Sequence, residues 1–266
     1  MAPRLFEIME KSENKKKLIA PIAGGIVIAL GLIVGFFVIK NVKDKDPLEK
    51  YVSIETKENT SGETESESSN SDEGGIKINI DWDGLNDLNP DIYAYIYVPG
   101  TDVSYPILQK ENDNDFYLTR DVKGKEDDNG CLYTQVMYDD KSFDDEFTVI
   151  YGRNAKDGSM FASLHNFEDY GCFDENRFFY IYTPEKTYTY QIYAAYVSDD
   201  THLFYKVQKD NVMSLQWFVE SLQNLDPSKG IVSNEMYVTF IEKFVVLQTG
   251  TGDDATRFNV VGVLVE

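Results

Sequence analysis

The chain has 266 residues, of which 42% are hydrophobic and 14% aromatic, and these values allow one substantial globular core. Its formal net charge of −21 leaves no basic surface for nucleic-acid phosphates, which argues against nucleic-acid binding. Two cysteines and two histidines supply too few ligands for a disulfide scaffold or a zinc site, so the sequence predicts no metal and no other cofactor.

The N-terminal part of the chain contains a predicted membrane anchor. Residues 18–39 (LIAPIAGGIVIALGLIVGFFVI) are 22 residues without a charge, long enough for a helix to span a hydrocarbon core of roughly 30 Å. A cleavable signal peptide is the alternative, but its apolar region is about 7–15 residues long and ends at a small-residue cleavage site. We therefore expect a single-pass plasma-membrane protein, with residues 1–17 in the cytoplasm and the C-terminal domain outside the cell.

Residues 40–75 are predicted to be a disordered acidic stalk. Within them, the stretch 55–75 (ETKENTSGETESESSNSDEGG) has seven acids against one lysine and almost no apolar residue. Such a segment cannot bury enough apolar surface to offset the entropy of ordering its backbone. The globular domain is accordingly predicted to span residues 76–266.

The periodicity of this domain favours many short strands and few helices. Trp82, Leu85 and Leu88 indicate a short helix, and Leu215, Phe218, Val219 and Leu222 fall on one face of a longer helix that can lie on a sheet. The turn signals and the enrichment in Tyr, Val and Ile favour a β-barrel or sandwich. The predicted strands are residues 92–98, 147–151, 178–183, 187–197, 236–240, 244–249 and 257–265.

Five sequence blocks, in one order, resemble the class B sortases of Gram-positive bacteria. They are IDWDGLNDLNPDIYAYIYVPGTDVSYPILQ, NDFYL, TVIYGRNAKDGSMFASL, FFYIYTPEKTYTYQIYAAYV and VVLQTGTGDDATRFNVVGVLVE. The resemblance extends over residues 76–266 and the anchor. It implies a mainly β fold, an eight-stranded sortase-type β-barrel with added helices, and descent from transpeptidases that cut a sorting signal and join the protein to the cell wall or a pilin.

The chemistry of that family needs a cysteine nucleophile, a histidine that transfers protons and an arginine that stabilises the developing oxyanion. Here Arg153 stands at the histidine position of a YGHN-like segment, Gly250 stands at the cysteine position of a TLSTC-like strand, and only Arg257 matches. Glycine has no nucleophilic side chain, and an arginine cannot accept a proton at neutral pH. The sequence therefore predicts a pseudoenzyme.

The resemblance also implies a peptide groove, with contacts from Asn114, Leu118, Tyr151 and Thr249. An amide, an apolar side chain, an aromatic ring and a hydroxyl suit contacts with an extended peptide. We therefore expect the protein to retain peptide binding although it has lost catalysis.

Two arginines in one cleft repel each other unless an anion lies between them. Because Asp253 and Asp254 lie in the turn between Gly250 and Arg257, we predict that at least one of them pairs with Arg153 or Arg257. The alternative is that the arginines receive an external carboxylate, such as a peptide C-terminus.

A relocated catalytic centre is the competing interpretation. Cys131, Cys172 and His165 are its candidates, although we interpret the cysteines as buried and structural and His165 as a surface residue. The sequence does not decide whether Cys131 and Cys172 form a disulfide, because it does not fix the distance between them. Acidic segments at 126–128, 139–140 and 144–146 lack regular calcium-ligand spacing and favour a solvated face.

The predicted function is a membrane-anchored pseudo-sortase that binds sorting-signal peptides or cell-wall or pilus assembly partners. The alternative from the enzyme class is an active cysteine transpeptidase that anchors surface proteins through relocated groups.

Overall fold

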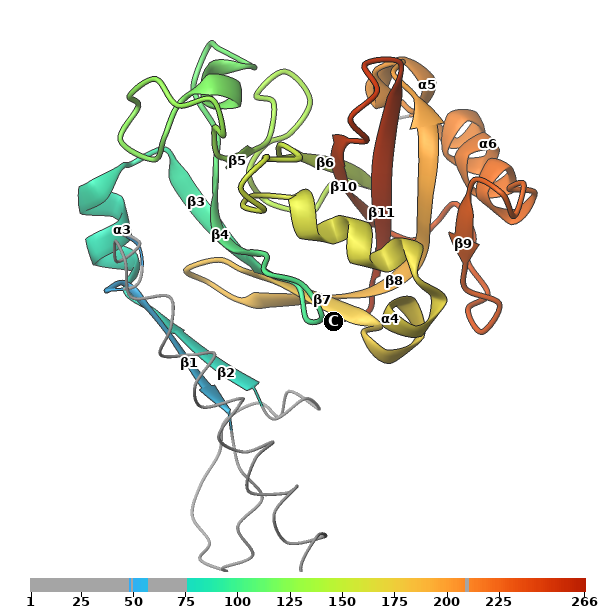
Figure 1. Ribbon diagram of the computed structural model, residues 1–266, viewed down its shortest axis with the longest axis horizontal. Coiled ribbons are helices and arrows are strands. Elements are labelled where there is room, and N and C mark those ends of the chain that lie inside the picture. Colours follow the sequence, from blue (N-terminus) through green and yellow to red (C-terminus); the bar gives the residue numbers. More distant parts are fainter. Residues whose placement is uncertain (1–47, 49, 57–75, 209–210) are drawn as a thin grey trace, which may run out of the picture. The chain divides into compact units, whose positions relative to one another are not determined.

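A computed structural model describes residues 48, 50–56, 76–208 and 211–266 of the chain (Figure 1). The chain divides into two units, Met1–Asn79 and Ile80–Glu266. The predicted cytoplasmic segment and membrane span lie outside the described residues. Among the residues that are described, no helix is both long and apolar enough to cross a membrane.

The first unit contains a small two-stranded sheet. Strand β1 (Val52–Thr56) pairs with β2 (Ile76–Ile80). Residues 52–56 belong to the segment that we predicted to be disordered, and that prediction is wrong there. The alternation of Val52 and Ile54 with polar neighbours supports a strand once a partner strand is present.

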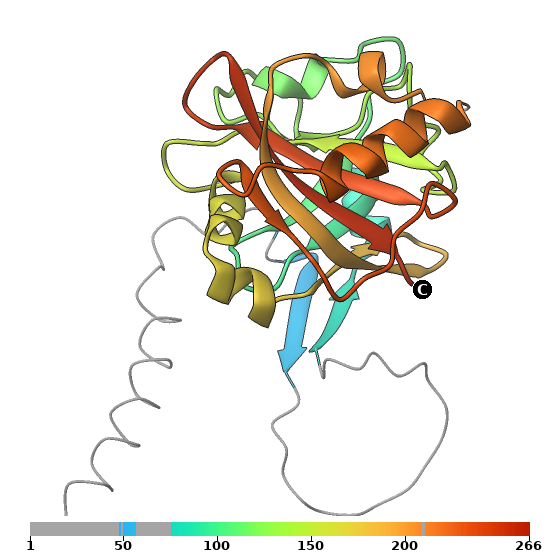
Figure 2. The same cartoon turned by 90° about the vertical axis from the view of Figure 1, so that its right-hand side faces the viewer.

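The second unit is a closed β-barrel (Figures 1 and 2). Its sheet runs in the order β11-β10-β6-β5-β4-β3-β7-β8, and an additional β11–β8 pairing closes the ring of eight strands, while β9 attaches to β8. The predicted mainly β, eight-stranded barrel is therefore confirmed. The barrel strands are β3 (Ile92–Tyr97), β4 (Ser104–Leu108), β5 (Leu132–Tyr133), β6 (Phe147–Tyr151), β7 (Phe178–Tyr182), β8 (Thr187–Asp199), β10 (Phe244–Gly250) and β11 (Thr256–Leu264), with β9 (Gly230–Val232) outside the ring.

The helices lie at the ends and on the outside of the barrel. Both predicted helices form, as α3 and α6, and Asp81 and Asn211 cap their N-termini through side-chain hydrogen bonds. The full set is α3 (Trp82–Leu88), the 3-10 helices η1 (Phe116–Thr119) and η2 (Ala162–Glu168), α4 (Tyr170–Glu175), α5 (Leu203–Lys206) and α6 (Val212–Gln223).

One predicted strand is absent. Residues 236–240 form no strand, although their residue types favour one. The Thr239 amide donates to the Glu242 carboxylate at 3.1 Å, and Tyr237 is 90% exposed, so this segment is held by a local turn and presents its largest side chain to solvent.

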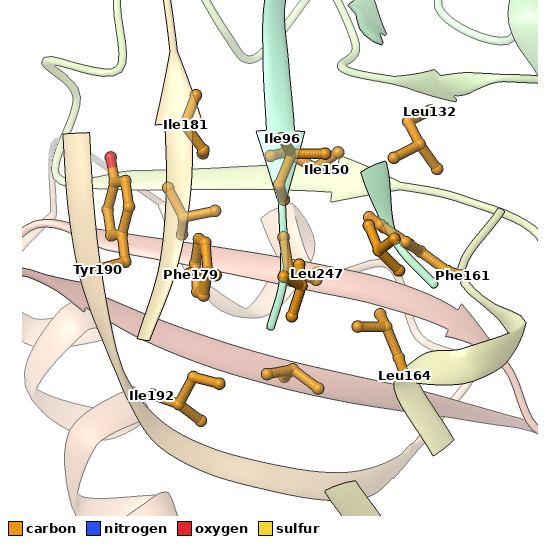
Figure 3. Close-up of a cluster of buried hydrophobic side chains, with 14 of the residues drawn as sticks. Ile96, Leu132, Ile150, Phe161, Leu164, Phe179, Ile181, Tyr190, Ile192 and Leu247 are labelled. Carbon is orange, nitrogen blue, oxygen red and sulfur yellow. The ribbon is translucent and has the colours of Figure 1, made fainter. Parts of the chain in front are cut away.

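Strand β10 shows how the barrel separates two hydrophobic clusters. Leu247 points into the barrel (Figure 3), and Val245 belongs to the same buried cluster of side chains from the barrel strands. Phe244 and Val246 point outward and are covered by α6, whose Phe218 ring meets that of Phe244 edge-on at 5.8 Å. Because both faces of β10 are covered, its first four residues, Phe244 to Leu247, are all apolar rather than alternating with polar ones. This packing fixes the end of β10, where the candidate site lies.

Candidate active-site cleft

The barrel topology brings the three family positions together. In the antiparallel β10–β11 pair, Gly250 lies directly opposite Arg257. Strand β6 runs parallel to β10, with Tyr151 beside Gln248, so Arg153 follows immediately beyond the end of β6 at the same edge. These positions are far apart in sequence, and the closure of the barrel places them around one cleft.

The cleft has a volume of about 440 Å³, and Arg153, Gly250 and Arg257 all line it. Three of the four predicted groove residues, Leu118, Tyr151 and Thr249, line it as well. Asn114 is not part of the lining; its side-chain oxygen accepts a hydrogen bond from the Met137 amide at 3.0 Å and so positions a neighbouring loop.

The two arginines are held by main-chain carbonyls. Arg153 Nε donates to the Leu118 carbonyl at 3.0 Å. Arg257 Nη1 donates to the carbonyls of Asp254 and Thr256, at 2.9 and 2.7 Å. In the described part of the chain, neither guanidinium has a carboxylate within salt-bridge distance.

The predicted ion pair between the turn aspartates and the arginines is therefore not formed. Asp253 uses its carboxylate to accept from the Ala255 amide at 2.9 Å, an Asx-type turn that keeps the side chain local. Asp254 reaches Arg257 only through its main-chain carbonyl, and both aspartates are exposed. Gly252 has φ +92°, so the turn folds tightly enough for its own polar groups to satisfy one another.

His165 contacts the end of β10, and our sequence interpretation did not predict this contact. Its Nε2 lies 3.0 Å from the Gly250 carbonyl oxygen and its Nδ1 lies 2.5 Å from the Glu168 carboxylate. Its ring stacks on Phe258 with centroids 4.7 Å apart, and Asn154 Nδ2 donates to the same Gly250 carbonyl at 3.0 Å. His165 is partly buried, with 23% of its side chain exposed, and its contacts are more extensive than those expected of a surface residue. The residues around His165 show no periodic pattern in the sequence that would have predicted its contact with Gly250.

His202 also lines the cleft. Its Nε2 lies 2.8 Å from Gln135 Oε1, and its Nδ1 accepts from the Phe204 amide at 3.3 Å as the N-cap of α5. These contacts suit the neutral ring that carries its proton on Nε2. Burial lowers the pKa of His202, and the nearby Asp115 acts in the opposite direction. With both nitrogens engaged, His202 presents no free lone pair to the cleft.

The two cysteines are free thiols outside the cleft lining. Burial, assisted by Asp121 and Asp127, raises the pKa of Cys131 to about 12. Burial also raises the pKa of Cys172, whose sulfur lies 3.9 Å from the Gly100 carbonyl oxygen. A cysteine must be a thiolate to act as a nucleophile, so neither environment favours nucleophilic chemistry.

Thr249 contributes a buried polar atom to this site. The residue is 2% exposed, and its Oγ1 has no hydrogen-bond partner within the described residues. Buried hydroxyls are normally paired, so such a group beside a cleft is a candidate ligand contact. Within the same described residues, no three His, Cys, Asp or Glu side chains gather as metal ligands.

Comparison with known proteins identifies related folds and sequences. No protein-family model matches the chain. Sortase B of Listeria monocytogenes is 30% identical over 165 residues, covering 62% of this chain and 65% of that protein, and sortase B of Staphylococcus aureus is 21% identical over 168 residues, covering 63% and 66%. The chain thus matches just under two thirds of the length of these curated relatives.

Solved structures agree with this result. The crystal structure of Clostridium perfringens sortase B superposes with a TM-score of 0.61 at 23% identity, covering 69% of this chain and 99% of that one. Sortase B from Bacillus anthracis, in complex with AAEK2, superposes with a TM-score of 0.59 at 30% identity, covering 71% and 84%. The first similarity establishes the fold, and the second adds sequence identity over most of that chain. The chain belongs to the class B sortase family.

Proposed function

We propose that this protein is a non-catalytic member of its family that binds extended peptides in the cleft between β6, β10 and β11. The proposal is supported by the resemblance, which matches Gly250 and Arg153 to the positions where the family chemistry requires a cysteine and a histidine, and by the cleft that both residues line. Glycine supplies no nucleophile, and a guanidinium cannot act as a base at neutral pH.

The described side chains offer no replacement for the missing pair. A relocated centre would need a thiol next to a histidine inside the cleft. Cys131 and Cys172 are not part of the cleft lining, and no hydrogen bond joins either sulfur to a histidine in the described residues. His165 is close to Gly250, but both of its ring nitrogens already face oxygen acceptors. An active transpeptidase would need a nucleophile close to His165, and neither cysteine supplies one there.

Peptide recognition is supported by the groups that remain. Leu118 and Tyr151 supply apolar and aromatic surface, and Thr249 supplies a hydroxyl without a partner. A solved Staphylococcus aureus sortase B–substrate complex has the same fold, with a TM-score of 0.60 at 21% identity over 70% of this chain and 85% of that one. Sorting-signal peptides, or the cell-wall or pilus proteins that carry them, are accordingly the proposed partners.

The proposed location is the outer face of the plasma membrane. The support is the uncharged run at residues 18–39, which is long enough to span a bilayer and is preceded by a short basic segment. External protease added to intact cells should release a fragment that contains the barrel. A mature protein that begins just after residue 39, free in the medium without added protease, would contradict the anchor.

The test of inactivity uses the full-length chain, purified in detergent, and fluorescent peptides that cover the sorting regions of surface proteins from the same organism. We expect binding in fluorescence anisotropy and no cleavage, with or without a thiol-alkylating reagent. Gly250→Cys alone should stay inactive because Arg153 still cannot transfer protons, and Gly250→Cys with Arg153→His is the smallest change expected to restore cleavage. Thiol-sensitive cleavage by the unmodified chain would disprove the proposal.

A further inference from the structure

We infer that the cleft binds the C-terminal carboxylate of a peptide, so that its ligand is a chain end rather than an internal segment. This inference rests on the proposed peptide-binding function and specifies its ligand. The two guanidiniums of the cleft form no ion pair with Asp253 or Asp254, the aspartates that we expected to neutralise them.

The guanidinium of Arg153 has a fixed orientation, but some of its hydrogen-bond donors have no partner in the described residues. Its Nε donates to the Leu118 carbonyl at 3.0 Å, which fixes the plane of the guanidinium. Its two terminal nitrogens make no hydrogen bond within the described residues and lie in the lining of the cleft. A guanidinium held by one edge has its other donors available, and two parallel N–H groups match the two oxygens of a carboxylate.

Arg257 is in a similar state on the neighbouring strand. Its Nη1 is used by the carbonyls of Asp254 and Thr256, whereas Nε and Nη2 have no partner in the described part of the chain. Carbonyl oxygens orient a guanidinium but do not cancel its charge. The cleft therefore holds two positive groups without a paired carboxylate, and a bound anion would relieve their repulsion, which water screens poorly in a partly enclosed site.

The space next to these arginines fits an additional carboxylate oxygen. A Cβ built on Gly250 would have no atom within 4 Å, so the position of the family nucleophile is empty space that opens on the cleft. Thr249 Oγ1, buried and without a partner, adds a hydroxyl donor at the adjacent position. An internal peptide bond offers one neutral oxygen to this site, whereas a chain end offers two oxygens and a negative charge.

The remainder of the lining restricts which anions fit. Asp115, Asp200, Asp253 and Asp254 also line the cleft. These acids disfavour ligands with several negative charges, and they favour a basic side chain near the bound end. The ligand class is therefore a peptide with a free C-terminal carboxylate and a basic residue close to it.

The experiment compares two matched peptide libraries. Both consist of randomised octapeptides with biotin at the N-terminus, and they differ only in a free carboxylate or a carboxamide at the C-terminus. The full-length chain in detergent is selected against each library. The enriched sequences are then synthesised in both forms, and their Kd values are measured by fluorescence anisotropy at low and at physiological salt.

We expect the selected free-carboxylate peptides to lose at least tenfold in affinity when they are amidated. Arg153→Gln and Arg257→Gln should each weaken the acid form by about 10–100-fold, the range for a hydrogen bond to a charged group, and leave the amide form unchanged. Gly250→Asp, which places an internal carboxylate in the empty space, should also abolish binding of the acid form. Arg177→Gln removes the same charge from a residue outside the cleft lining and is the matched control.

The outcomes separate this inference from the proposed function. Equal affinity for acid and amide forms would overturn the carboxylate inference and leave peptide binding in place. Loss of affinity in Arg177→Gln equal to that in the cleft variants would overturn it too, because the effect would then be one of net charge. Failure of both libraries to yield a binder would refute the proposed function and the inference together.

Discussion

Substitution of His165 tests whether the histidine stabilises the end of β10, at the centre of the cleft. In the folded chain, His165 lies in η2 and contacts the Gly250 carbonyl, the Phe258 ring and the Glu168 carboxylate at the end of the same helix. His165→Ala removes all three contacts. His165→Phe keeps an aromatic ring against Phe258 but removes both hydrogen bonds, and the pair of variants therefore separates packing from hydrogen bonding.

The expected magnitude follows from the individual contacts. The hydrogen bond to Gly250 should contribute about 0.5–1.5 kcal/mol, and the ring pair with Phe258 a similar amount. The Glu168 side chain is 57% exposed, so its pairing with His165 is screened by solvent and should contribute only about 0–1 kcal/mol. Asn154 still donates to the Gly250 carbonyl in either variant, and no buried acceptor is left unpaired. His165→Ala should then lower the free energy of unfolding by about 1–4 kcal/mol, and His165→Phe by about half as much.

Urea unfolding of the full-length chain in detergent, followed by tryptophan fluorescence, measures these differences. Hydrogen exchange should also accelerate in residues 250–256 of His165→Ala, because the strand end loses its contact with η2. Glu168→Gln is the control for the exposed pair and should change the free energy of unfolding by less than about 1 kcal/mol. A His165→Ala variant within about 0.5 kcal/mol of the unmodified chain, with unchanged exchange, would refute the reasoning.

Two further predictions concern the barrel and its pH dependence. Gly262→Ala should destabilise the chain by about 1–3 kcal/mol, since its Cβ would lie 2.3 Å from the buried Phe179 ring, whereas Gly250→Ala, whose Cβ meets nothing within 4 Å, should leave thermal unfolding unchanged; equal effects would contradict this account. Burial lowers the pKa of His202 in the folded state, so its contribution to stability is present above the unfolded-state value of about 6.5 and is lost as the pH falls toward the folded-state value. His202→Gln should therefore reduce the loss of stability between about pH 7 and 5 in urea titrations, and an unchanged pH slope would count against this role.

Much of the fold could be predicted from residue patterns because these patterns are local. The positions of Leu215, Phe218, Val219 and Leu222 repeat with the period of a helix, and they cover the outer face of the barrel as expected. The strand predicted at residues 244–249 forms as β10. Residues 236–240 have similar strand-forming types, but they pair with no strand among the described residues, and pairing is not a local property.

The residue types at the two positions that the resemblance matches to the family cysteine and histidine were also determined by sequence alone. Gly250 and Arg153 lack the chemistry that the family requires in any conformation, because one has no side chain and the other keeps its proton. Their convergence at one edge of the barrel agrees with the resemblance, since β10 pairs with both β6 and β11.

Only the tertiary structure determines which polar groups in the cleft form hydrogen bonds with one another. His165 and Gly250 are 85 residues apart, and no spacing rule connects the short helix η2 with the end of β10. The pairing of Arg257 with main-chain carbonyls instead of Asp253 or Asp254 likewise depends on how the turn folds: in a short turn, the nearest carboxylate is taken by a backbone amide before it can reach a guanidinium. The sequence supplies the polar groups, but the closure of the barrel and the geometry of its turns determine which of these groups form hydrogen bonds with one another.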